Sequence, residues 1–157
     1  MPKLDTHVAI DAELQTIWSV MLDRIENPDR YVMGVESCVF VENTDDYAIR
    51  DLNIGGLVLR ERISINEEIG EVKYQLVDHP LYAGDVINAL VPADPKDPKD
   101  PKAKNVVQFR MNWEPLNDEA VAIDRDNQSF IQEGLKQGIE FVKNIAEHMQ
   151  SEEDKKS

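Results

Sequence analysis

Six short extended runs follow one another between two amphipathic helical stretches, and this order most strongly constrains the fold. Each gap between the runs contains turn-forming residues, and the runs cover residues 37–42, 47–54, 57–65, 71–77, 86–91 and 106–113. Short connections of this kind favour antiparallel neighbours joined as a meander. With a further extended start at residues 7–10, the sequence predicts about seven strands.

Two helices flank these runs. The first follows Asp11, which we expect to cap it, and it ends at Asn27 because the residue before Pro28 disfavours the helical region. Its apolar residues recur at helical spacing: Leu14, Ile17, Trp18, Met21, Leu22 and Ile25. The second helix is predicted over residues 125–149. The whole order predicts an α+β fold, in which a curved seven-stranded antiparallel sheet wraps around a long C-terminal helix.

Two glycines interrupt the last helix on or beside its apolar face. Gly138 lies in the middle of that face, and Gly134 lies one turn earlier, at its edge. Glycine inside a helix costs about 1 kcal/mol relative to alanine. The two positions therefore suggest that another backbone or a ligand needs the space, and they favour a hollow between the sheet and this helix.

The length and composition indicate one domain. The 157 residues predict a single unit over residues 1–150, followed by a charged tail at 151–157 that we expect to be disordered. Three tandem Asp-Pro-Lys units lie within residues 94–104, where proline at every third position favours an extended, mobile loop between the last two strands.

The formal net charge is −14, and this acidity bears on partners. It repels phosphate backbones and anionic lipids, so we expect neither nucleic acid binding nor membrane insertion. The N-terminus lacks the apolar core of a signal peptide. A single cysteine, Cys38, excludes an internal disulfide. These features predict a cytoplasmic protein and leave its oligomeric state open.

Residues that would carry metal or cofactor chemistry are sparse. The histidines His7, His79 and His148 are far apart and lack metal-ligand spacing, and Cys38 has no cysteine partner, so we expect no metal site. The chain has no phosphate-binding loop and no nucleophile elbow, which leaves no cofactor to predict.

Alternation within the run from residue 57 places one carboxylate on an apolar face. Glu61 shares that face with Leu57, Leu59, Ile63 and Ile65. A buried carboxylate must be paired, hydrogen-bonded or protonated. We consider three interpretations of Glu61, namely a satisfied structural group that bonds a neighbour such as Tyr74, a group that orients a ligand, and a general acid or base.

The faces of the other runs follow in the same way. In the last run Val107, Phe109, Met111 and Trp113 face inward and Arg110 faces outward, while Val72, Tyr74 and Leu76 form the inward set of residues 71–77. The run over residues 47–54 allows two assignments. Either Tyr47, Ile49 and Asp51 point inward, or Ala48, Leu52 and Ile54 do, with Arg50 as a charged exception.

The order of elements resembles that of the START-like, or SRPBCC, superfamily of helix-grip proteins. Residues 12–22, with Trp18 at their centre, are similar to the first helix of many members, and residues 32–38 and 55–62 resemble the uncharacterised AtaL-like branch. The resemblance covers about residues 3–149. It implies a deep cavity between the sheet and the last helix, in which superfamily members bind lipids, sterols, polyketides and other apolar molecules. Some members are cyclases or dehydratases, but no shared catalytic motif defines the superfamily.

Three functional hypotheses follow. The first is a carrier or sensor that binds a small hydrophobic ligand of lipid, polyketide or aromatic type, without a cofactor. Its candidate ligand-binding residues are Leu59, Glu61, Ile63, Tyr74, Leu76, Phe109, Met111, Trp113, Gly134 and Gly138. The second is a polyketide cyclase or dehydratase that uses Glu61 as acid or base and Tyr74 to polarise an oxygen. A purely structural or protein-binding module is a third hypothesis.

Overall fold

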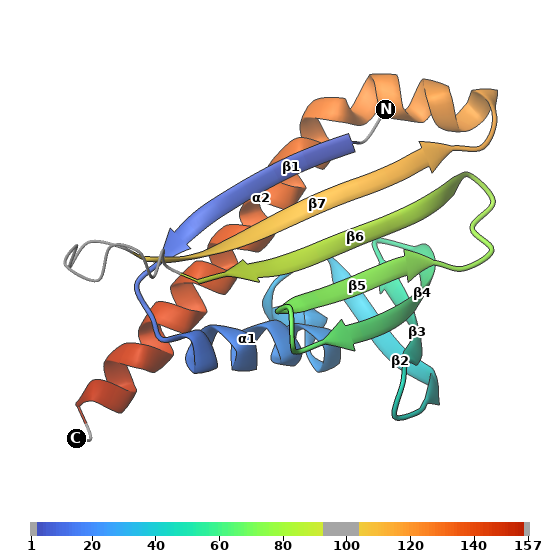
Figure 1. Ribbon diagram of the computed structural model, residues 1–157. Coiled ribbons are helices and arrows are strands. Elements are labelled where there is room, and N and C mark those ends of the chain that lie inside the picture. Colours follow the sequence, from blue (N-terminus) through green and yellow to red (C-terminus); the bar gives the residue numbers. More distant parts are fainter. Residues whose placement is uncertain (1–2, 93–103, 156–157) are drawn as a thin grey trace.

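The computed structural model describes residues 3–92 and 104–155, apart from the side chains at 128, 130 and 131. A curved sheet carries both helices on one side, and the long C-terminal helix runs diagonally across it (Figure 1). The elements in chain order are β1 (Lys3–Ile10), α1 (Leu14–Glu26), the short 3-10 helix η1 (Pro28–Arg30), β2 (Val35–Asn43), β3 (Ala48–Ile54), β4 (Leu57–Asn66), β5 (Glu71–Leu76), β6 (Tyr82–Val91), β7 (Asn105–Pro115) and α2 (Asp118–Asp154).

The sheet is an antiparallel meander with one addition. Its strand order is β1-β7-β6-β5-β4-β3-β2, so each strand from β2 to β6 pairs with the next strand along the chain. β1 pairs with β7 and forms one edge of the sheet, while β2 forms the other. The predicted α+β fold, with a short helix after the first strand and a long helix at the end, is confirmed.

The start of α1 differs from the prediction. The helix begins at Leu14, and Glu13 is its N-cap residue without a side-chain hydrogen bond. The expected capping role of Asp11 is therefore wrong. The backbone N–H of Asp11 instead donates to Oε2 of Glu147 at 2.8 Å, which ties the end of β1 to α2.

Helix α2 is longer at both ends than the predicted 125–149. It begins at Asp118, where the side chain of Asn117 accepts a hydrogen bond from the backbone N–H of Ala120. Asn117 is thus the N-cap, a role that asparagine fills well. The helix continues through Asp154, which corrects the tail predicted to be disordered from residue 151. The Asp-Pro-Lys units, and the predicted loop up to residue 103, lie outside the described residues.

Strand β6 begins at Tyr82, earlier than the predicted residue 86. Gly84 lies inside the strand with a φ of +124°, and a Cβ there would collide with the backbone oxygen of Asn112 on β7. Only glycine allows this close approach. Gly84 is therefore an irregular position within a strand, and the predicted run missed the residues of β6 that precede Val86.

Two apolar clusters fill the concave side of the sheet. The larger cluster joins β5 and β7 to both helices and includes Ile17, Met21, Val72, Phe109 and Val142, all of which are buried. The smaller cluster lies around the start of α2 and contains Leu59, Leu76, Tyr82 and Ala120, with Trp113 packed against them. Fully burying one such large side chain contributes about 1.5–3 kcal/mol.

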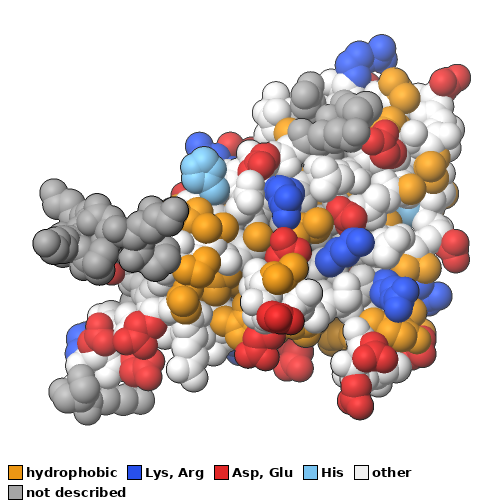
Figure 2. All heavy atoms as spheres, in the orientation of Figure 1, with side chains coloured by type: hydrophobic (Ala, Val, Ile, Leu, Met, Phe, Trp, Pro, Cys, Tyr) orange, Lys and Arg blue, Asp and Glu red, His pale blue; other side chains and the backbone are white. Residues whose placement is uncertain are grey.

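The surface agrees with the acidic composition. Acidic side chains gather toward the C-terminal end of α2, where Glu152, Glu153 and Asp154 follow one another (Figure 2). Among the described residues, no helix is both long enough and apolar enough to cross a membrane.

Candidate functional site

Strand β4 positions the candidate carboxylate as the alternation predicted. Leu59, Glu61 and Ile63 are buried on the concave side, whereas Val58, Arg60 and Arg62 are exposed on the other. Leu57 and Ile65 share the inward face but lie near the strand ends, where about half of each side chain is exposed.

Strand β3 follows the second of the two assignments that the sequence left open. Arg50 and Leu52 are buried on the concave side, and Asp51 on the opposite face pairs with Arg60 of β4. Arg50 is therefore a charged residue on an inward face, as that assignment required. Because β3 and β4 pair with Arg50 opposite Glu61, the two exceptions in the apolar pattern lie side by side.

Arg50 and Glu61 form a buried ion pair. Both Nε and Nη2 of Arg50 donate to Oε1 of Glu61, at 3.1 and 3.0 Å, and the two side chains are only 4% and 9% exposed. Nη1 of Arg50 donates at 2.5 Å to the backbone oxygen of Ile25, near the C-terminal end of α1. The pair agrees with the structural interpretation of Glu61, but its partner is Arg50 and not Tyr74, the example named for that interpretation.

A second guanidinium lies above the same region. Cζ of Arg24, from α1, is 4.7 Å from the ring centroid of Phe109 and 5.5 Å from that of Tyr74. Cζ of Arg50 is 5.2 Å from the Tyr74 ring, so two cations flank this tyrosine. Attraction between a cation and an aromatic ring of about 0.5–2 kcal/mol favours this stacking.

The Tyr74 hydroxyl faces inward and has no hydrogen-bond partner among the described residues. Burial raises the pKa of Tyr74, and the charges of Arg24 and Arg50 act in the opposite direction without cancelling the effect. Tyr74 is thus a protonated, unused donor at neutral pH. Nε of Arg24 likewise has no partner within the described part of the chain.

Asn88 is an inward polar residue that the sequence analysis missed. It lies on β6 between Val72 of β5 and Phe109 of β7, and its side chain is fully buried. Within the described ranges, neither its amide nitrogen nor its amide oxygen has a hydrogen-bond partner. Alternation with Val86 and Leu90 is the signal in the sequence that could have revealed Asn88.

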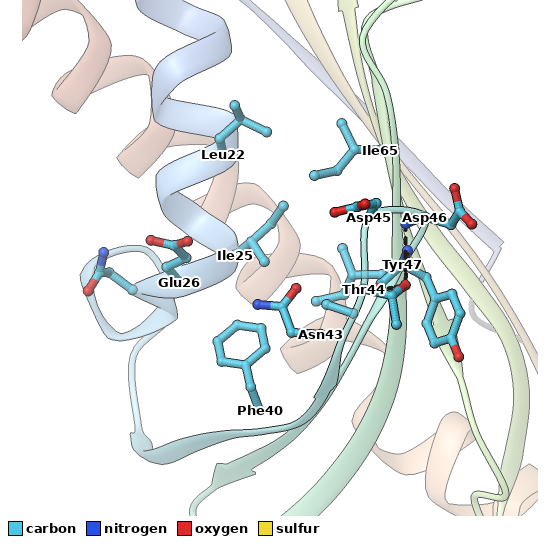
Figure 3. A pocket seen from close by; sticks show the side chains of 13 residues that line it. Leu22, Ile25, Glu26, Phe40, Asn43, Thr44, Asp45, Asp46, Tyr47 and Ile65 are labelled. Carbon is cyan, nitrogen blue, oxygen red and sulfur yellow. Dashed lines mark hydrogen bonds between the residues drawn. The ribbon is translucent and has the colours of Figure 1, made fainter.

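A pocket opens between α1, the β2–β3 hairpin and β4 (Figure 3). Its volume is about 610 Å³, within the range of about 300–1,000 Å³ that is typical of ligand sites. Its apolar walls are Leu22, Ile25, Phe40, Ala48, Ile63 and Ile65, and its polar lining is Glu26, Asn27, Asn43, Thr44, Asp45, Asp46 and Tyr47. This pocket lies against α1, whereas the sequence predicted a hollow against α2.

The predicted ligand-binding residues fall into separate groups. Ile63 lines the pocket and, with Tyr74 and Phe109, belongs to the larger cluster. Leu59, Leu76 and Trp113 belong to or pack against the smaller cluster, while Met111 lies on β7 opposite Val86. Glu61 lies opposite Leu76 and does not line the pocket.

The two glycines of α2 occupy different surroundings. Gly138 is buried, and a Cβ there would lie 3.7 Å from Phe109 and 3.8 Å from Arg24, which are ordinary contact distances. Gly134 is exposed, and a Cβ there would meet no described atom within 4 Å outside its local helix. Neither glycine is therefore required for a close backbone approach.

The part of the chain that the structure describes contains no group of three or more His, Cys, Asp or Glu residues placed to hold a metal ion. Cys38 is half-buried on β2, and burial raises the pKa of its thiol, which disfavours the reactive thiolate.

The comparisons with known proteins identify the fold. No family model matches the chain, and no curated protein matches it in sequence. Among solved structures, Zhui aromatase/cyclase from Streptomyces sp. R1128 superposes with a TM-score of 0.69 at 13% identity, over 92% of each chain. The di-domain aromatase/cyclase StfQ from the steffimycin biosynthetic pathway gives 0.74 at 12% identity, over 94% of this chain and 51% of StfQ. A protein from Thermus thermophilus gives 0.71 at 14% identity, over 92% of this chain and 97% of that one.

The chain has the helix-grip fold that these structures share. Identities this low establish the fold alone. The helix-grip assignment made from the order of elements is thus confirmed, whereas the AtaL-like branch is not tested by these likenesses.

Proposed function

We propose that this helix-grip protein binds a small, largely apolar molecule on the concave side of its sheet and acts as a carrier or sensor. The observation that carries the proposal is the pocket of about 610 Å³ with six apolar side chains in its walls. The sequence placed the ligand against α2. The pocket supports the same function from the neighbouring region, between α1 and strands β2 to β4.

The chemistry of the pocket favours binding through burial of apolar surface. Each Å² of apolar surface removed from water contributes about 25 cal/mol, so an aliphatic or aromatic body gains affinity in proportion to its contact with the walls. Ile63 and Ile25 extend these walls into the larger apolar cluster. The remaining candidate residues on the concave side, among them Tyr74, Phe109 and Gly138, stay part of the proposed ligand surface.

The test is a thermal-shift screen with fatty acids and aromatic polyketides, followed by native mass spectrometry of the hits. Ala48→Phe projects a benzyl group into the pocket and narrows it, because Ala48 lines it at the start of β3. Ile49→Phe is the matched control, since Ile49 is the next residue and does not line this pocket. We expect Ala48→Phe to weaken binding at least tenfold and Ile49→Phe to leave it unchanged. Equal affinities for both variants would contradict binding in this pocket.

A cyclase or dehydratase activity is the second candidate function. Two observations favour it, the inward burial of Glu61 and the structural likeness to two aromatase/cyclases. The Arg50 guanidinium occupies Oε1 of Glu61, so this activity requires the ion pair to open or to act as a unit. Incubation with the polyketides that bind, followed by mass spectrometry for loss of water, tests it. A rate that is unchanged in Glu61→Gln would exclude Glu61 as the acid or base.

A further inference from the structure

We propose that the pocket between α1 and the β2–β3 hairpin selects amphiphiles with a positively charged head group. This inference rests on the proposed function and adds the chemical class of the ligand. It is carried by the charges around the pocket, which are separate from its apolar walls.

The lining of the pocket is acidic. Of its 13 residues, none is lysine, arginine or histidine, whereas Glu26, Asp45 and Asp46 contribute carboxylates. Glu26 lies at the end of α1, and both aspartates lie in the turn between β2 and β3. An anionic head group would thus enter a site that offers it no cation.

The directions of the two aspartates differ. In Figure 3 the Asp45 side chain points across the pocket toward Leu22 and Ile25, while Asp46 points to the opposite side of the hairpin. Both residues are exposed, and among the described residues neither carboxylate forms an ion pair with a lysine or arginine. The charge of Asp45 is therefore available to a ligand.

The geometry separates two contributions to binding. The apolar walls act equally on all ligands with the same hydrocarbon body, whereas Asp45 and Glu26 act only on the head group. A cation at the mouth stays partly in water, so its desolvation costs little, and an exposed carboxylate changes affinity about two- to fivefold. An anion at the same place is repelled by a similar factor. The preference for a cationic over an anionic head group is thus expected to reach about tenfold.

The experiment uses isothermal titration calorimetry with three probes that share a ten-carbon chain: decylammonium, decanol and decanoate, each below its aggregation concentration at pH 7. We expect decylammonium to bind about tenfold more tightly than decanoate, with decanol between them. Asp45→Asn should remove most of this tenfold ratio, because it ends both the attraction of the cation and the repulsion of the anion, and added salt, which screens charges at the mouth, should also reduce it.

Asp46→Asn is the matched control. It removes the same charge from the adjacent residue, and asparagine suits a turn as well as aspartate does. We expect it to leave the ratio close to that of the unchanged protein. If Asp46→Asn lowers the ratio as much as Asp45→Asn, the preference comes from the overall charge of −14, and the inference is overturned.

The remaining outcomes separate the inference from the proposed function. If decanoate binds as tightly as decylammonium, charge selection is wrong while ligand binding stands. If none of the three probes binds to the unchanged protein, the pocket does not take up apolar chains, and both proposals fail together.

Discussion

Breaking the Arg50–Glu61 pair should be far more costly than breaking an exposed pair on the same two strands. Glu61→Leu removes the carboxylate that accepts from Nε and Nη2 of Arg50 and leaves a guanidinium that is 4% exposed. Removing one partner of a buried pair costs about 3–5 kcal/mol, chiefly because the remaining charge is uncompensated. We expect Glu61→Leu to lower the free energy of unfolding by that amount.

The double variant Arg50→Met/Glu61→Leu should recover part of the loss. With both charges gone, the desolvation cost of the pair disappears, and an apolar pair of similar size is often neutral or stabilising. The backbone oxygen of Ile25 loses the donor Nη1 of Arg50, however. An unsatisfied buried acceptor costs about 1–3 kcal/mol. We therefore expect the double variant to be about 1–3 kcal/mol less stable than the unchanged protein, and more stable than Glu61→Leu.

The control is the outward pair of the same strands. Arg60 donates to Asp51 at 2.8 and 2.9 Å, which is closer than the buried contacts, yet the two side chains are 47% and 30% exposed. Exposed ion pairs contribute about 0–1 kcal/mol, so Asp51→Leu should cost less than about 1 kcal/mol from loss of the pair.

Urea unfolding followed by circular dichroism supplies the free energies by linear extrapolation. A Glu61→Leu variant no less stable than Asp51→Leu would refute the argument that burial determines the value of the pair. A double variant no more stable than Glu61→Leu would also refute it, because uncompensated charge would then not be the cause.

Three further predictions concern other parts of the interior. Asn88→Leu should raise the melting temperature, because it replaces two buried polar atoms without described partners by an apolar side chain. A lower melting temperature would show that an internal water or a ligand satisfies the amide of Asn88. Gly138→Ala should raise the free energy of unfolding by about 1 kcal/mol, because alanine favours the helix and its Cβ would meet Phe109 at an ordinary contact distance of 3.7 Å. Gly134→Ala is the comparison at an exposed site. A loss of stability or of ligand affinity in Gly138→Ala alone would show that the space beside Gly138 is needed. Burial acts to raise the pKa of Asp23, but hydrogen bonds from Tyr31 and Asn27 and the charge of Arg30 outweigh it and lower the pKa. The ionised carboxylate therefore stabilises the fold at neutral pH, and this stabilisation is lost as the pH falls below about 4. Urea unfolding of Asp23→Asn should show a shallower loss of stability over that acid range, and a pH dependence equal to that of the unchanged protein would contradict the assignment.

The fold could be predicted because its main signals are local. Turn residues between short extended runs determine a meander, and period-two alternation assigned the faces of β4, β5 and β7 correctly. The errors lie where a tertiary contact decides. Gly84 resembles a strand break in the sequence because its close approach to Asn112 depends on the neighbouring strand, and Asp11 resembles a helix cap because its contact with Glu147 joins opposite ends of the chain.

The site was less predictable because pairing between strands is not visible in one strand. The sequence predicts Glu61 as a charged exception on an apolar face, and Arg50 as one under only one of two open assignments, but only the register of β3 and β4 places the two opposite each other. The position of the pocket depends on how α1 lies over β2 to β4, and no periodicity in the sequence encodes that distance. Of the predicted ligand-binding residues, only Ile63 lines it.

The polar groups of the interior share a location that stability alone does not explain. Arg24, Arg50, Tyr74 and Asn88 approach the concave side from α1, β3, β5 and β6, and three of them have buried polar atoms without described partners. A core optimised only for stability would contain apolar side chains there, since each unsatisfied buried group costs about 1–3 kcal/mol. Conflicts between local preference and packing are expected at functional sites. Ile25 connects this group to the pocket, because its side chain lines the wall while its backbone oxygen accepts from Arg50. A ligand that displaces Ile25 would therefore also disturb the ion pair, so the same ligand should stabilise the unchanged protein and the Glu61→Leu variant to different extents.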